Sequence, residues 1–338
     1  MLPDPVATVV IPTLSADRKL EECLTALGRQ TRRDFEVIIV DNGGKGLVRC
    51  GAGWRSGARV IEPGRNVGFG AAINLGFHQS RAAYLATLND DAVVHAEWLD
   101  KLVAAAEEHP DAGMFASQVR FYGEEHLDSA GMVIGRDGSS KQRGHLFPSA
   151  EFDREEEVLL PSASAALYRR RMLEEIGLFD EDFFLYCEDT DLGLRARRAG
   201  WKCIYVPQAV VEHHYSHSAG RASPLKAYYV ERNRLFVLAK NFPARMLWAA
   251  PFATLARYWW HLRSIALGRG TAAQFRREGN SGLRLMLIVM QAHWGLLRAA
   301  RGLWRKRRAI QRGAKVPAAD FHALLHAHLI PARRVAEL

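Results

Sequence analysis

Between residues 6 and 88 the sequence alternates β-branched runs with stretches of helical spacing, and this alternation restricts the fold more than any other feature. Strands are expected at residues 6–11, 35–40, 59–61 and 84–88, and helices at 17–29 and 70–80. Strands and helices that alternate in this way form a largely parallel sheet covered by helices. The sequence therefore predicts an α/β fold with a mostly parallel central sheet, flanked by helices on both faces.

Polar residues follow two of these strands at the point where each strand ends. Asp41 closes the second strand, and Asn89, Asp90 and Asp91 follow the fourth. Sheets of this class bind ligands at the carboxyl ends of their strands. Carboxylates at such a position can hold Mg²⁺ or Mn²⁺, and such an ion bridges diphosphate oxygens. A polar turn that caps the next helix is the alternative, and the motif alone does not decide between them.

A second acidic group lies at residues 180–191, where six carboxylates occur within twelve residues, among Phe and Tyr. A half-buried carboxylate in this segment, such as Asp189 or Glu188, would have a raised pKa and could act as a general base. Capping of a helix start explains the same acids without chemistry. Asp191 and Arg195, four residues apart, could likewise pair on a helix surface.

Three histidines in five residues follow a β-branched run at 203–211. They are His213, His214 and His217, and an imidazole from this group could ligate the same metal ion. Histidines without any ligand role are the alternative.

Residues Asn66–Asn74 match a dinucleotide-binding GxGxxG pattern only in part, because Ile73 replaces the third glycine. We interpret this segment as a tight backbone at a helix start, close to a ligand.

Taken together and in order, these segments resemble the family 2 inverting glycosyltransferases with a GT-A fold, and among them the rhamnosyltransferase-like branch. The resemblance covers residues 6–242, about two thirds of the chain. It rests on the order and spacing of the segments VVIPTL (9–14), VDNGG (40–44), NVGFGAAINLGF (66–77), LNDDAVV (88–94), GLFDEDFFLYCEDTDLGLRARRAGWKCIYVP (177–207), EHHYSHS (212–218) and YYVERNRLFVLAKNFP (228–243).

The resemblance implies a role for each matched position. The residues expected to bind the nucleotide-sugar donor are Pro12, Thr13, Asp41, Asn66, Gly68, Asn74, Asn89 and Asp90. Asp41 would accept a hydrogen bond from the pyrimidine. Asn89 replaces the usual first Asp of the DXD motif, so Asp91 would be the main ligand of Mg²⁺ or Mn²⁺, with His213 or His214 completing the site. Asp189, beside Glu188, matches the catalytic base.

The implied reaction transfers a sugar with inversion from a nucleotide-diphosphate donor to a hydroxyl of a glycan or lipid-linked acceptor, in cell-surface polysaccharide synthesis. L-Rhamnose from dTDP-rhamnose is the first choice of donor. Two other functions stay open. A nucleotidyltransferase usually carries a Gly-rich phosphate loop with Lys or Arg where this chain has Pro12-Thr13-Leu14-Ser15. A non-catalytic sugar- or partner-binding module would not need Asp91, Asp189 and the histidines.

The C-terminal region differs from the rest of the chain in charge. Residues 241–338 carry 17 Lys and Arg against 3 Asp and Glu, whereas residues 1–240 carry 29 against 34. Helical spacing, Trp and Arg together suit a membrane interface. We expect a catalytic domain at 1–222 and a basic helical region at 223–338 that associates with the inner leaflet; a helical appendage or subunit interface is the alternative. No nucleic-acid recognition motif accompanies the charge, and the oligomeric state is undetermined.

The remaining features indicate a cytoplasmic protein, peripheral on the inner face of the plasma membrane. The four cysteines lack CxxC spacing, so reduced thiols and no zinc site are expected. The N-terminus lacks the pattern of a signal peptide. No 18 consecutive apolar residues occur that would predict a spanning helix.

Overall fold

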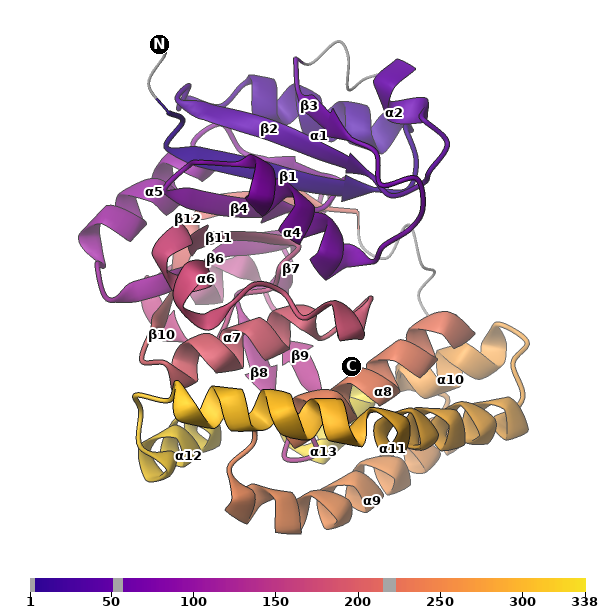
Figure 1. Cartoon of the computed structure of the whole chain (residues 1–338). Coiled ribbons are helices and arrows are strands. Elements are labelled where there is room, and N and C mark those ends of the chain that lie inside the picture. The colour runs from indigo at the N-terminus through magenta and orange to yellow at the C-terminus, as the bar shows by residue number, and fades with distance from the viewer. Residues whose placement is uncertain (1–3, 51–56, 215–222) are drawn as a thin grey trace. The chain divides into compact units, whose positions relative to one another are not determined.

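Figure 1 shows the computed structural model of the chain, which describes residues 4–50, 57–214 and 223–338. These residues form two compact units, each assembled from separate segments. Unit 1 comprises residues 4–132, 142–184 and 201–214, and unit 2 comprises residues 133–141, 185–200 and 223–338. The predicted domains 1–222 and 223–338 are contiguous, whereas the units are not, because segments 133–141 and 185–200 pack with the C-terminal helices. The predicted division of function between the two domains stays a prediction.

Unit 1 contains the central sheet and its covering helices. Its strands are β1 (Ala7–Thr13), β2 (Phe35–Asp41), β3 (Arg59–Ile61), β4 (Tyr84–Leu88), β5 (Ala92–Val94), β6 (Ala112–Phe121), β7 (Leu127–Ser129), β10 (Glu156–Val158), β11 (Ala165–Arg169) and β12 (Lys202–His213). Its α-helices are α1 (Arg18–Gly28), α2 (Leu47–Cys50), α4 (Phe69–Gln79), α5 (Trp98–Glu108) and α6 (Arg170–Ile176), with 3₁₀ turns η1 (Ser149–Phe152) and η2 (Glu181–Phe183).

The sheet has the order β10-β12-β6-β11-β4-β1-β2-β3, with β5 added on β12 and β7 on β6. β3, β2, β1 and β4 are parallel neighbours, visible side by side in Figure 1. β11 runs antiparallel between β4 and β6, and β12 is parallel to β6. β1 to β4, β6 and β12 therefore share one direction. The predicted α/β fold with flanking helices is confirmed, as a mixed sheet in which β11 interrupts the parallel strands.

Side chains alternate between the two faces of the sheet along each strand. Both faces therefore present apolar side chains, and helices cover both. Val9 and Ile11 of β1 belong to the apolar core that includes Leu24 of α1 and Leu102 of α5. Val10 faces the other side, where α4 approaches so closely that a Cβ on Gly76 would lie 2.5 Å from the Val10 side chain. The apolar core and the close α4 packing hold the strand ends in fixed positions.

Unit 2 is mainly helical. It contains α7 (Glu188–Arg198), α8 (Pro224–Asn241), α9 (Ala244–Ala266), α10 (Gly270–Arg277), α11 (Gly282–Arg312), α12 (Ala318–Ala327) and α13 (Ala332–Glu337). The short strands β8 (Met132–Ile134) and β9 (Ser140–Gln142) pair with each other where the chain passes between the units. No helix among the described residues has the length and apolar character needed to cross a bilayer.

Buried ion pairs join the elements of unit 2. Glu231 of α8 pairs with Arg234 on its own helix and with Arg257 of α9, at 2.7 Å from the Arg257 guanidinium. Arg257 also pairs with Asp137, at 2.5 Å, and the Tyr258 hydroxyl donates to Glu231. Burial alone would raise the pKa of Glu231, but the two arginines lower it strongly. Removing one member would leave an uncompensated buried charge, so this cluster fixes α8 against α9 and segment 133–141.

Candidate active site

The carboxyl ends of β1, β2 and β4 meet at one edge of the sheet in unit 1, as their parallel pairing requires. The backbone N–H of Asn42, just after β2, donates to the carbonyl of Thr13 at the end of β1, at 2.8 Å. The Thr13 hydroxyl donates to the Asp90 carboxylate at 2.6 Å. Pro12 lies opposite Val40 of β2. The structure thus brings the predicted residues Pro12, Thr13, Asp41, Asn89 and Asp90 to the same edge.

Asp41 has an unused acceptor at this edge. Its carboxylate is buried, and one oxygen accepts a hydrogen bond from the Gly43 N–H at 3.0 Å. The other oxygen, Oδ2, is buried without a hydrogen-bond partner within the described part of the chain. Buried polar atoms nearly always have a partner, so this oxygen is suited to accept a hydrogen bond from a ligand.

The segment around Gly68 is held by the turn that precedes the acidic helix. Gly68 has φ +90°, and a Cβ there would lie 2.3 Å from the carbonyl oxygen of Phe184, so only glycine fits. The Phe69 N–H donates to the same carbonyl at 2.8 Å. Asn66 accepts a hydrogen bond from the Gly68 N–H, and the Asn74 amide both donates to and accepts from the Phe179 backbone. Asn74 therefore links two segments of unit 1, and its predicted contact with a nucleotide stays a prediction.

Asp91 lies against His213, which is in turn fixed by a second carboxylate. The Asp91 Oδ1 atom is 3.0 Å from Nε2 of His213, and Nδ1 of His213 is 2.8 Å from Oδ2 of Asp128 in β7. Asn89 also lies within 3.1 Å of the His213 Nε2. All three members of this triad are buried. A metal-ligating histidine usually binds the ion through one ring nitrogen and donates the N–H of the other to a carboxylate, and Nδ1 of His213 faces Asp128 in that way.

The charges within this triad are strongly coupled. Burial alone would lower the pKa of His213, but the hydrogen bonds to Asp128 and Asp91 raise it to about 10. Burial likewise opposes ionisation of Asp128, yet the hydrogen bonds from His145 and His213 lower its pKa to about 2. The pKa of Asp91 is lowered mainly by His213, against the effect of burial. Asp91, His213 and Asp128 therefore form a buried ion-pair network.

His214 makes different contacts from its neighbour. Its backbone N–H donates to the Asp91 carbonyl at 3.1 Å, but its ring stacks on Tyr122, with the ring centroids 3.9 Å apart. Its Nε2 lies 3.4 Å from the Glu22 carboxylate. The side chains of successive residues in an extended chain point to opposite sides, so the ring of His213 faces the Asp91 carboxylate and the ring of His214 does not. His217, the third histidine of the sequence motif, lies outside the described residues.

The Asp91–His213 pair fits a divalent cation. Two ligands at right angles on an octahedral ion, each about 2.1 Å away, lie about 3 Å apart, which is the separation of this carboxylate and imidazole. Among residues 4–50, 57–214 and 223–338, no group of three or more His, Cys, Asp or Glu has metal-binding geometry. Mg²⁺ is usually bound through one or two carboxylates and completes its shell with water and substrate phosphates, so a site for it need not hold three protein ligands.

In unit 2, Glu188 and Asp189 begin helix α7 directly after an unusual turn. Phe184, Tyr186 and Cys187 all have positive φ although none is glycine, a conformation that costs free energy and accumulates at functional sites. The buried Asn233 of α8 stabilises this turn by donating to the carbonyls of Leu185 and Tyr186, both at 2.8 Å. The turn therefore presents the start of α7 in a fixed position.

Burial and the adjacent Asp189 raise the pKa of Glu188 to about 8. The Oε2 atom of Glu188 is buried and has no hydrogen-bond partner in the described ranges. Asp189 is partly exposed, and its Oδ1 accepts a hydrogen bond from the Thr190 N–H at 2.6 Å. Asp189 is thus a partly exposed acceptor, and its neighbour Glu188 favours its own protonated form. Such a pair of carboxylates is suited to proton transfer.

Comparison with known proteins identifies the family. The model described as Glycosyl transferase family 2 matches residues 8–177, half of the chain. The N-acetylglucosaminyl-diphospho-decaprenol L-rhamnosyltransferase of Mycobacterium tuberculosis (strain H37Rv) is 31% identical over 299 residues, covering 81% of this chain and 96% of that protein. The chain belongs to glycosyl transferase family 2. The predicted family, with its rhamnosyltransferase-like branch, is confirmed.

Two solved structures share the fold of this family 2 glycosyltransferase. GalNAc-T7, solved with UDP, GalNAc and Mn²⁺, superposes with a TM-score of 0.58 at 16% identity, over 73% of this chain and 49% of that one. The mannosyltransferase PcManGT from Pyrobaculum calidifontis, in complex with GDP-Man and Mn²⁺, gives 0.51 at 18% identity, over 90% and 89%. This chain spans about half of the first protein and most of the second. The predicted GT-A fold is confirmed. The family match favours glycosyl transfer over the nucleotidyltransferase and the non-catalytic module.

Sequence reasoning missed several residues that support the site of this glycosyltransferase. Asp128 and His145 lie in the stretch 120–160, whose Gly and charge content predicts turns, yet His145 Nδ1 is 3.3 Å from the Asp128 carboxylate that holds His213. Nothing in the local pattern marks either residue, because Asp128 contacts His213 across 85 residues of chain and His145 in turn contacts Asp128. Asn233 lies within the quoted segment 228–243, but its link to the turn before α7 has no local signal either.

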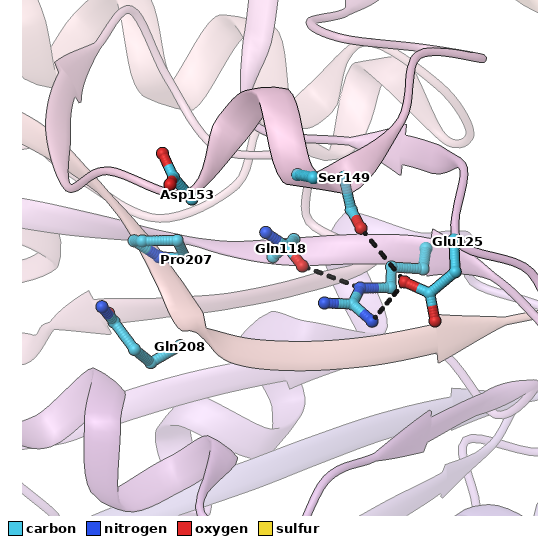
Figure 2. Close-up of a pocket in the computed structure, with 8 residues that line it drawn as sticks. Gln118, Glu125, Ser149, Asp153, Pro207 and Gln208 are labelled. Atoms are coloured by element: carbon cyan, nitrogen blue, oxygen red, sulfur yellow. Dashed lines mark hydrogen bonds and ion pairs between the residues drawn. The ribbon is translucent and has the colours of Figure 1, made fainter.

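A polar hollow of roughly 300 Å³ lies elsewhere in unit 1, beside the bulge of β12. Figure 2 shows the residues that line it, which are Gln118, Arg120, Glu125, Ser149, Ala150, Asp153, Pro207 and Gln208. Its side chains satisfy one another: Arg120 donates to Gln118 at 2.7 Å and to Glu125 at 3.1 Å, and the Ser149 hydroxyl donates to Glu125. None of the residues predicted from the sequence lines this hollow, so it has no part in the candidate site.

Proposed function

We propose that this glycosyltransferase moves L-rhamnose from dTDP-rhamnose, with inversion, to a hydroxyl of a glycan or lipid-linked acceptor in cell-surface polysaccharide synthesis. The observation that carries the proposal is the buried Asp91–His213 pair, 3.0 Å apart and backed by Asp128, at the strand ends of a GT-A sheet. The choice of sugar and acceptor follows a 31% identical relative named as an N-acetylglucosaminyl-diphospho-decaprenol L-rhamnosyltransferase.

In this proposal the residues of unit 1 bind the donor. Oδ2 of Asp41 accepts a hydrogen bond from the pyrimidine N–H, which gives that buried oxygen its missing partner. Asp91 and His213 would hold Mg²⁺ or Mn²⁺, and Asp128 keeps the imidazole in the orientation that a ligand needs. The bound ion would supply positive charge that stabilises the departing diphosphate.

The acidic pair of unit 2 acts on the acceptor. Asp189 takes the proton of the acceptor hydroxyl as its oxygen attacks the anomeric carbon from the face opposite the diphosphate. The new glycosidic bond forms while the bond from the anomeric carbon to the diphosphate oxygen breaks, so configuration inverts without a covalent enzyme intermediate. Glu188, with its raised pKa, stays protonated at neutral pH and adds no second negative charge beside the base.

Thermal shifts with UDP, dTDP and GDP, each with and without Mn²⁺, test the donor site. We expect dTDP with Mn²⁺ to stabilise the protein most, because ligand binding to the folded state raises the melting temperature. His213→Ala should abolish the part of the shift that depends on Mn²⁺, and Asp128→Asn should weaken metal binding by about 10- to 100-fold. His214→Ala is the matched control, since this ring stacks on Tyr122, and it should retain the full shift.

Mass spectrometry of the products then identifies the sugar. Release or transfer of rhamnose from dTDP-rhamnose supports the donor assignment. Turnover of a UDP-hexose or GDP-mannose in its place would refute the donor and leave the family intact. If dTDP raises the melting temperature of the wild type equally with and without Mn²⁺, the proposed metal site is refuted.

A further inference from the structure

Helix α9 carries an exposed apolar stripe. It consists of Trp248, Phe252, Leu255, Trp259 and Leu262, whose exposed fractions range from 54% to 83%. These residues follow one another at intervals of four and three, so they share one face of the helix. The residues of α9 that are buried, Met246, Ala250, Arg257 and Ser264, lie on the opposite face. The stripe therefore lies on the side of α9 that faces away from the packing within unit 2.

Helix α11 carries a second stripe with the same spacing. It consists of Leu283, Leu287, Met290, Trp294 and Leu297, whose exposed fractions range from 47% to 65%. The buried residues of α11, Ile288, Ala292, Leu303 and Arg307, again lie on the other side of the helix. Single exposed apolar residues are common on proteins, but two continuous helical stripes indicate a surface that meets an apolar partner.

Charge distinguishes between the partners that such a surface could meet. Neither α9 nor α11 contains a single Asp or Glu. Beyond Leu297 the stripe of α11 continues in the same register as Arg301, Arg305, Arg308 and Arg312. A second copy of this chain would bring a basic face against another basic face, whereas an anionic lipid surface complements it.

Arginine and tryptophan are also paired in the manner of a membrane interface. The Arg298 guanidinium carbon lies 5.4 Å from the Trp294 ring centroid, and that of Arg308 lies 5.3 Å from the Trp304 centroid. On α9, Arg263 lies 5.8 Å from the Trp259 centroid. Rings with an apolar body beside a long cationic side chain suit the boundary between headgroups and acyl chains.

We propose that the α9 and α11 stripes insert into the headgroup boundary of an anionic bilayer, with Arg301, Arg305 and Arg308 contacting the lipid phosphates. The inference deepens the proposed function, on which it rests for a membrane-bound acceptor. Insertion of the two stripes thereby concentrates the enzyme at the membrane surface, where a lipid-linked acceptor is found.

Vesicle flotation of the full purified chain tests the inference, with phosphatidylcholine vesicles with and without phosphatidylglycerol. We expect flotation only with phosphatidylglycerol, and less of it at high salt. Changing Arg301, Arg305 and Arg308 together to Gln should weaken partitioning by roughly a hundredfold, because each basic residue near an anionic surface contributes about fivefold. Arg154→Gln, at a side chain 93% exposed on unit 1, is the matched charge control and should float like the wild type.

The apolar half of the surface needs its own variants. Trp294→Ser with Leu297→Ser, and Trp248→Ser with Phe252→Ser, should each reduce flotation, and the four changes together should reduce it further. Leu47→Ser replaces an apolar residue of unit 1 that is 54% exposed and should change nothing. Circular dichroism and melting temperature verify that the variants are folded.

The outcomes separate this inference from the proposed function. Release of rhamnose from dTDP-rhamnose without vesicles should be the same for the stripe variants and the wild type. Failure of the wild type to float, or flotation that the stripe variants retain, would overturn the membrane surface even if rhamnose is released. A wild-type dimer in light scattering that the stripe variants dissociate would assign the surface to self-association instead. Flotation without any sugar turnover would overturn the proposed function alone.

Discussion

At two positions of helix α7, only three residues apart, the pKa values of the buried carboxylates Asp191 and Glu188 are shifted in opposite directions. Asp191 is fully buried and pairs with the Lys240 ammonium at 2.7 Å and with Arg195 at 2.9 Å, while Asn241 donates to it at 2.8 Å. Burial disfavours its charge, but these partners lower its pKa far below the usual range. Glu188 is buried beside another carboxylate, and its pKa rises to about 8.

The difference separates a carboxylate that stabilises the fold from the carboxylate pair to which we assign a role in the proposed function. A carboxylate whose charge is balanced by buried cations holds elements together, as Asp191 holds α7 to the end of α8. Glu188, whose pKa is raised by burial and by the neighbouring Asp189, instead favours its protonated form. The three predictions that follow test this contrast along α7.

The largest effect is expected on turnover when Asp189 is changed to Asn. Loss of a general base lowers the rate by about 10²- to 10⁴-fold. The donor-dependent thermal shift should stay unchanged, because Asp189 is partly exposed and is assigned to the acceptor rather than to donor binding. Steady-state kinetics with the identified donor measure the effect, and Asp182→Asn, at an exposed acid of η2, is the control. A rate within severalfold of the wild type would remove Asp189 as the base.

Asp191→Asn should act on stability. It removes the carboxylate that pairs with the buried Lys240 and Arg195, and breaking a buried ion pair costs about 3–5 kcal/mol of the free energy of unfolding. Urea unfolding and the melting temperature measure the loss. If Asp191→Asn is as stable as the wild type but inactive, the contrast between the two regions of α7 is wrong.

The smallest effect is expected from Glu188→Gln, and it depends on pH. The raised pKa means that the folded state binds a proton more tightly than the unfolded state, whose Glu has a pKa of 4.5. The stabilisation is complete below pH 4.5 and is lost as pH rises towards 8. Urea unfolding between pH 5 and 8.5 should show a shallower loss of stability for the variant. Parallel pH profiles for variant and wild type would contradict the raised pKa.

Much of the framework was predictable from the sequence because it depends on local patterns. The strands expected at 59–61 and 84–88 match β3 and β4, and the helices expected at 17–29 and 70–80 match α1 and α4 within two residues. Helical and strand periodicities follow from backbone geometry alone, so a single stretch of chain records them. The sequence placed Thr13 and Asp90 at the carboxyl ends of strands, and the pairing of β1 with β4 in the structure brings them together.

The ion-pair partners were not predictable in the same way. The i,i+4 pair of Asp191 and Arg195 was expected on a helix surface, but the structure buries it and adds Lys240 from 45 residues beyond Arg195. Asp128 had no local mark at all. When a counter-charge comes from a distant element, the sequence around either partner shows no periodic pattern that marks the pair. Only the folded structure then reveals it.

The sequence by itself determined the α/β class, the family and the set of acids and histidines that we propose for the glycosyltransferase site. The tertiary structure decided which members of that set are chemically distinct. It placed His213 rather than the His214 ring on Asp91, neutralised Asp191 and left Glu188 beside Asp189. The physical reason is that ionisation depends on burial and on charges within a few ångströms, and those distances are set by contacts between segments far apart in the chain.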